Sequence, residues 1–188
     1  MRIVVGLGVL AVLAACGGGN ANEVNGSYRG QSISVSDGLL LPTQRDLLGG
    51  SVSVVALESA PGACSLLQRS SINNTRIVTI ALGIETVDGL LAPATATGTY
   101  AIGGPPFVTP GTKLAGVRFG IIGACGRGNT ADALSGSVQI DRAIANTAGT
   151  VTHLEGTFQA VFDNAESLSG AFQVGLCPGA RLAFGLCR

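Results

Sequence analysis

The chain has 188 residues, which is enough for one ordinary domain and too few for two. Eleven Lys and Arg balance eleven Asp and Glu, so no basic surface supports a nucleic-acid partner. The 29 glycines and the absence of Trp disfavour a helical protein, because each Gly inside a helix costs about 1 kcal/mol relative to Ala.

The first element is an apolar run at the amino terminus. Arg2 precedes residues 3–15, which are all apolar or Gly. The run is too short to span a bilayer, which needs about 20 residues. A basic start, a short apolar core and small residues at its end are typical of a secretory signal peptide. We therefore expect residues 1–15 to be a cleaved signal.

Leu13-Ala14-Ala15-Cys16, at the end of this run, resembles the lipobox of bacterial lipoproteins. The resemblance implies cleavage before Cys16, diacylation of its sulfur and acylation of the new amino group, so that the membrane is a partner through a lipid anchor. Gly17 follows the cysteine, which in that family implies the outer membrane of the cell envelope. The alternative is a soluble secreted protein with a chance cysteine. We expect 16–26 to be a flexible tether and 27–188 to be a single β domain.

After the tether, short β-prone runs alternate with Gly, Pro, Asn and Asp, which predicts an all-β fold. We expect an antiparallel β-sandwich or an up-and-down barrel of about 8–9 strands, and the pattern does not separate the two. Asp37-Gly38 and Asp88-Gly89 each predict a tight turn, and the alternative for the two Asp is a shared cation. A helical turn is expected at 64–68. The expected strands are 28–36, 51–58, 75–82, 97–102, 115–122, 134–141, 150–162, 167–176 and 181–186.

One sequence pattern occurs three times, at 134–140, 154–160 and 168–174. Each copy reads Leu, polar, Gly, small, apolar, Gln, apolar. With a period of two, the Leu, the Gly and the two later apolar residues share the inner face of a strand, and the Gln points outward. A Gly in the middle of a strand leaves room for a neighbouring side chain or allows a sharp bend. We expect three related strands of a meander; the alternative is a functional Gln ladder.

Four cysteines remain after Cys16. Export favours oxidation, and an even number predicts two disulfides. Pro178-Gly179 predicts a hairpin turn that separates Cys177 from Cys187 by roughly 20 Å along the sheet. A disulfide needs Cα atoms within about 7 Å, so Cys177–Cys187 is not expected to form. Cys177 and Cys187 should each bond to Cys64 or Cys125, which leaves two connectivities open.

The sequence contains few candidate catalytic residues. His153 is the one histidine, and the strand phase places it on the outer face beside Glu155. No Gly-x-Ser-x-Gly motif occurs, the glycine-rich segment 123–129 lacks the Lys-Ser/Thr of a phosphate loop, and the cysteines are too far apart for a zinc site. Asp163 and Glu166 flank a predicted turn. We therefore predict no enzyme, no catalytic, cofactor-binding or metal-ligating residue, and no cofactor.

Most of the chain is similar to Gly-rich, cysteine-stapled, β-rich lipoproteins of social, gliding Gram-negative bacteria. The resemblance rests on the lipobox, on a strand leading to Cys64-x-x-Leu67-Gln68, and on terminal Gly-x-Phe strands that close with Cys. It implies no particular activity.

Three functions are compatible with these observations. The expected one is a membrane-anchored, non-enzymatic module with a structural or protein-interaction role. The alternative is a carrier of an apolar small molecule or lipid in a barrel cavity, because Gly136, Gly156, Ala160 and Gly170 are small residues on the inner face. A hydrolase with an unrecognised site is the third.

Overall fold

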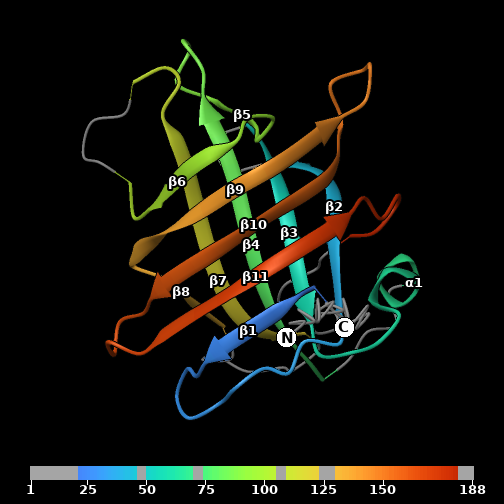
Figure 1. Cartoon of the computed structure of the whole chain (residues 1–188), viewed down its shortest axis with the longest axis vertical. Coiled ribbons are helices and arrows are strands. Elements are labelled where there is room, and N and C mark those ends of the chain that lie inside the picture. Colours follow the sequence, from blue (N-terminus) through green and yellow to red (C-terminus); the bar gives the residue numbers. More distant parts are fainter. Residues whose placement is uncertain (1–20, 46–49, 70–73, 105–108, 123–129, 182–188) are drawn as a thin grey trace, which may run out of the picture.

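The computed structural model describes residues 21–45, 50–69, 74–104, 109–122 and 130–181. In these ranges the protein is all-β, as predicted, with eleven strands and one short helix (Figure 1). The strands are β1 (Glu23–Gly26), β2 (Asp37–Arg45), β3 (Ser51–Glu58), β4 (Thr75–Glu85), β5 (Leu91–Pro93), β6 (Gly98–Ile102), β7 (Lys113–Ile122), β8 (Thr130–Asp132), β9 (Ser135–Ala145), β10 (Val151–Val161) and β11 (Ser167–Gly175). The helix α1 spans Ala63–Gln68, where a helical turn was expected.

The strands form one curled sheet in the order β1-β11-β10-β9-β6-β7-β4-β3-β2, with β5 added to β4 and β8 added to β7. Figure 1 shows β6, β9, β10, β11 and β1 crossing in front of β7, β4, β3 and β2, so the sheet curls into a half-barrel. The sheet is mixed and not purely antiparallel, because β6 and β7 run parallel over two residue pairs, Ala101–Leu114 and Ile102–Ala115.

At one corner of the half-barrel, β2, one end strand of the sheet, meets the residues that follow β11, the strand next to the other end. Leu40 of β2 forms a parallel bridge to Leu176, and the Cys177 amide donates to the Leu40 carbonyl at 2.8 Å. Cys177 is disulfide-bonded to Cys64 of α1, with a Cα–Cα distance of 5.7 Å. The bond selects one of the two connectivities left open and leaves Cys177 unavailable to Cys187. Cys125 and Cys187 lie outside the described residues.

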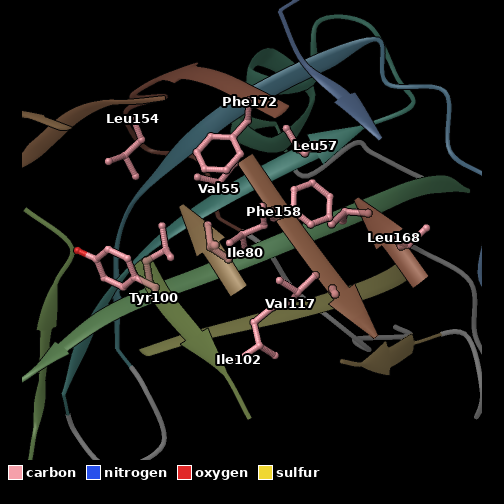
Figure 2. Close-up of a cluster of buried hydrophobic side chains, with 14 of the residues drawn as sticks. Val55, Leu57, Ile80, Tyr100, Ile102, Val117, Leu154, Phe158, Leu168 and Phe172 are labelled. Atoms are coloured by element: carbon pink, nitrogen blue, oxygen red, sulfur yellow. The ribbon is translucent and has the colours of Figure 1, made fainter. Parts of the chain in front are cut away.

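Two apolar clusters occupy the two faces of β3. The larger lies between the layers of the half-barrel and takes Val55 and Leu57 from β3, together with side chains such as Tyr100, Phe158 and Phe172 (Figure 2). The smaller lies outside the sheet, where Val54 and Ala56 pack beneath α1. This double burial explains why β3 has a nearly continuous apolar sequence. The smaller cluster is covered by α1 and by residues 177–180, which the Cys64–Cys177 disulfide joins to α1. We call these two segments the α1 cover.

The three copies of the repeat lie on the adjacent strands β9, β10 and β11. Phe158 of β10 lies directly across from Gly170 of β11, and Phe172 of β11 lies directly across from Gly156 of β10. A Cβ at Gly170 would lie 2.8 Å from Phe158 Cε1, and one at Gly156 would lie 3.1 Å from Phe172 Cζ. Each Gly therefore makes room for the ring of the neighbouring copy, as one of the two sequence interpretations expected. Leu134 departs from the pattern, because it precedes β9 and is 62% exposed.

The amino-terminal part of the domain differs from the sequence expectation in two ways. The sheet begins with β1, which pairs with β11 and lies inside the segment 16–26 expected to be a tether. The segment 28–36 is not a strand, because Tyr28 and Gln31 bridge each other around Arg29 and Gly30, both with positive φ. Such a tight turn reverses the chain immediately, and the segment is held by the burial of Tyr28 and Ile33 and not by a ladder.

The two Asp-Gly pairs are not equivalent. Asp88-Gly89 lies in the turn between β4 and β5, where Gly89 has a φ of +76° and its amide donates to the Thr86 carbonyl. Asp37-Gly38 instead begins β2, so the turn predicted there is wrong. The Asp37 carboxylate accepts from the amides of Gly38 and Ala63, both at 2.8 Å. A contact with a helix 26 residues away in sequence therefore replaces the local turn.

Candidate functional site

The strands β1, β11, β10, β9 and β6 form the front layer in Figure 1. The outer face of this layer carries mostly uncharged polar side chains in two rows. The strand register places Asn25, Ser169, Gln159 and Ser137 side by side in the first row. The second row is formed by Glu23, Ala171, Thr157, Gln139 and Thr99. The alternation of the repeat produces this face, because the same period of two that buries Phe158 turns its neighbours outward.

An open groove of about 530 Å³ runs along these rows. Ser137, Gln139, Thr157, Gln159 and Ser169 supply hydroxyl and amide groups, and Glu23 is its one charged lining residue. The Thr99 hydroxyl donates to Gln139 Oε1 at 2.8 Å, which fixes one amide at the end of the second row. Hydroxyl and amide groups both donate and accept hydrogen bonds at any physiological pH. The groove therefore offers a row of hydrogen-bonding groups to a bound molecule.

A charged cluster adjoins the groove on the same face. Glu155 Oε1 lies 2.7 Å from His153 Nε2, accepts from Gln173 Nε2 at 3.0 Å, and contacts Arg142 Nη1 at 3.4 Å. The hydrogen bond with His153, then the charge of Arg142, holds the pKa of Glu155 below its usual range. His153 is thus on the outer face beside Glu155, as predicted. Its partner is a carboxylate, with no nucleophile in the cluster.

His153→Gln is expected to change the free energy of unfolding by less than about 1 kcal/mol. The reason is that the His153–Glu155 pair is partly exposed, and such pairs contribute little after solvent screening. Urea denaturation of the wild type and the variant at pH 7 measures the difference. A loss above about 2 kcal/mol would contradict this assignment, because it would require a buried, partnered histidine.

The remaining predicted residues fall in several places. Those outside the described ranges are Cys16, Cys125, Cys187, the glycine-rich segment 123–129, and all of the strand expected at 181–186 except its first residue. Asp163 and Glu166 do flank a turn, between β10 and β11. They receive the loop that follows β1, because Glu166 accepts from the Arg29 amide and Asp163 accepts from the Tyr28 hydroxyl at 3.3 Å. Their role in the described fold is to hold that loop.

Sequence reasoning missed Glu58, the last residue of β3. Its side chain is fully buried on the face of the sheet that carries the smaller apolar cluster. This burial raises the pKa of Glu58 to about 7, and the negative charge of Asp37 adds to the shift. The available signal was a lone carboxylate that ends the run Ser51–Glu58, whose other even positions are apolar.

No protein-family model matches the chain, and neither a curated protein nor a solved structure is significantly similar to it. Within the described ranges, no three His, Cys, Asp or Glu side chains gather closely enough to hold a metal ion. The same ranges contain no helix with the length and apolar character needed to cross a membrane.

Proposed function

We propose that the protein is an exported lipoprotein, anchored through Cys16 in the outer membrane, and that it acts as a non-enzymatic interaction module. Its binding surface is the groove on β1, β11, β10 and β9, and its partner is another envelope protein. The observation that carries the proposal is the composition of this groove, which combines short Ser, Thr, Ala and Gly positions with flanking Gln and Asn amides.

The chemistry of the groove supports a protein partner. Short side chains across four strands let another backbone approach closely, while Gln139, Gln159 and Asn25 can pair with peptide N–H and C=O groups. A polar and uncharged surface of this kind is typical of interfaces that form and dissociate, and less of obligate apolar ones.

The place of the groove relative to the proposed anchor also supports the proposal. Glu23, the first residue of β1, lies seven residues after Cys16 and lines the groove. Seven residues span at most about 25 Å when fully extended. Lipidation of Cys16 would therefore hold the groove close to the membrane surface, where other anchored proteins are concentrated.

Photo-crosslinking in intact cells tests the groove. A photo-reactive residue at Thr157, in the middle of the groove, should give a discrete crosslinked species of defined mass. The same residue at Val87, which is 88% exposed on the turn after β4, should not. Ser169→Arg should suppress the Thr157 crosslink by filling the groove with a long charged side chain, whereas Val87→Arg should leave it unchanged. Equal crosslinking from both positions would contradict a specific partner at this face.

Cys16→Ala is expected to release the protein from membranes into the soluble envelope fraction. Two or three acyl chains bind a bilayer far more strongly than one, because each buried CH₂ contributes about 0.8 kcal/mol. Detergent phase partitioning of the wild type and the variant checks this result. Wild-type protein in the aqueous phase would contradict lipidation.

The alternative, a carrier of an apolar molecule within the sheet, receives less support from the packing. Gly156 and Gly170 were two of the small positions expected to leave space, and the rings of Phe172 and Phe158 lie across from them. Titration with a fluorescent fatty acid tests the carrier function directly. Saturable binding at micromolar concentration that survives Ser169→Arg would favour the carrier over the groove.

A further inference from the structure

Glu58 is the most unusual buried group of the described fold. It is 0% exposed, and neither of its carboxylate oxygens has a hydrogen-bond donor among the described residues. Most buried polar atoms have a partner, because an unpaired charge in an apolar environment costs several kcal/mol. A carboxyl group in such a position is stable as the neutral acid.

A second carboxyl group stands directly beside it. In the strand register Glu58 pairs with Asp37 on β2 and with Ile77 on β4. The Asp37 carboxylate accepts hydrogen bonds from two amides, including that of Ala63 in α1, whereas the Glu58 carboxylate accepts none from the described residues. Burial without a donor disfavours the charged form of the Glu58 carboxyl, so the proton of this two-carboxylate pair belongs on Glu58.

No basic group in the described residues offsets the pair. The helix α1 has the sequence ACSLLQ and carries no charge, and residues 177–180 carry none either. Arg69 caps the end of α1 and Arg181 follows residue 180, and neither contributes to the pKa shift of Glu58. Arg76 of β4 precedes Ile77 and therefore points to the opposite face, where its Nη1 donates to the Ser32 carbonyl at 2.9 Å. Among the described residues, Asp37 is the charged group that raises the pKa of Glu58, and it does so by repulsion.

We propose that Glu58 and Asp37 form a proton-operated clasp beneath the α1 cover: the cover is closed while Glu58 is protonated, and it opens when Glu58 releases its proton to solvent. Asp37 connects the pair to the cover through its bond to the Ala63 amide. The Cys64–Cys177 disulfide belongs to the cover, so opening exposes this bond.

The direction of the pH effect follows from the pKa values. The pKa of Glu58 is about 7 in the closed form and returns toward its ordinary 4.5 when the side chain is solvated. Between these values the closed form binds more protons than the open one, so closure is favoured fully below about pH 4.5. The preference for closure falls as the pH rises toward 7, and above that it stays low.

A proton fits this site better than a metal cation. Calcium takes six to eight oxygen ligands and magnesium needs an octahedral set. Here two carboxyl groups converge, and Asp37 already accepts from two amides.

The rate of reduction of Cys64–Cys177 tests the proposal. Full-length wild type and Glu58→Gln are treated with a phosphine reductant at pH 5 and pH 8, and alkylated peptides containing Cys64 or Cys177 are quantified by mass spectrometry. Because each rate is divided by that of Glu58→Gln at the same pH, the pH dependence of the reductant itself cancels. We expect this ratio to rise at least tenfold from pH 5 to pH 8, since two pKa units correspond to a factor of about 100. Glu85→Gln, a half-buried Glu at the end of β4, should behave as the wild type.

A direct titration of the wild-type protein tests the proposal even if Glu58→Gln fails to fold. In wild-type protein the side-chain carboxyl ¹³C resonance of Glu58 should titrate with a midpoint above pH 6. A midpoint near 4.5, or a reduction-rate ratio that does not change with pH, would overturn the proposal. Slower reduction in millimolar calcium, seen in the wild type and lost in Glu58→Gln, would also overturn it by making the pair a cation site.

Discussion

Replacing both Cys64 and Cys177 by Ala is expected to lower the free energy of unfolding by about 4 to 5 kcal/mol. The disulfide joins residues 113 positions apart, so its loss frees a long loop in the unfolded chain. The bond also lies at the corner where β2 meets the end of β11, next to the hydrogen bond between Cys177 and Leu40. Its loss should therefore loosen the closure of the half-barrel as well.

Urea denaturation at pH 6 without reductant measures this effect. Hydrogen exchange should show faster exchange at the Cys177 amide, while the centre of β10 stays protected. A loss of stability below about 1 kcal/mol would show that the unfolded chain is already compact in this region.

Peptide mapping under non-reducing conditions addresses the other two cysteines. With Cys64 bonded to Cys177, the even number of cysteines predicts a second bridge between Cys125 and Cys187. A peptide that contains these two residues joined is the expected product. Free thiols at both positions would contradict full oxidation.

Gly170→Ala is expected to destabilise the protein by about 3 kcal/mol, a large effect for one added methyl group. The new Cβ would lie 2.8 Å from Phe158 Cε1 and closer still to the carbonyl oxygen of Glu23. A ring can turn aside, but the Glu23 carbonyl belongs to the backbone of β1 and can move only if the strand moves. The substitution should therefore detach β1 from β11.

Gly175→Ala in the same strand is the matched control, because no heavy atom lies within 4 Å of its added Cβ. Thermal denaturation of both variants should show a much lower Tm for Gly170→Ala and a nearly unchanged Tm for Gly175→Ala. Similar Tm values for the two variants would contradict the clash with β1. They would mean that Gly→Ala acts only through the backbone entropy of the unfolded chain.

Much of the sheet could be predicted from local pattern. The strand expected at 51–58 has those same limits as β3, and 167–176 corresponds closely to β11. The helical turn was also expected at the position of α1. In these segments the burial of one or both faces imposes a period on the sequence, and that period is visible without knowing the partner strand.

The errors occur where a distant contact overrides the local preference. β1 has a polar sequence, EVNG, and forms because β11 offers an unpaired edge. Asp37-Gly38 has the composition of a turn, yet it extends as β2 because Glu58 lies across from it and Ala63 donates to its carboxylate. Neither contact can be predicted from the residues next to it in the sequence.

By itself the sequence determined that the chain is all-β, that the repeat 154–160 and 168–174 buries its Phe and turns its Gln outward, and that Cys177–Cys187 would not be the disulfide. These features depend on alternation and on distance along the chain, which are local quantities. The tertiary structure decided that Cys177 bonds to Cys64, that Phe158 lies across from Gly170, and that Glu58 is buried beside Asp37. Each of these depends on which strands become neighbours when the sheet curls, and that choice is made by the packing of the whole core.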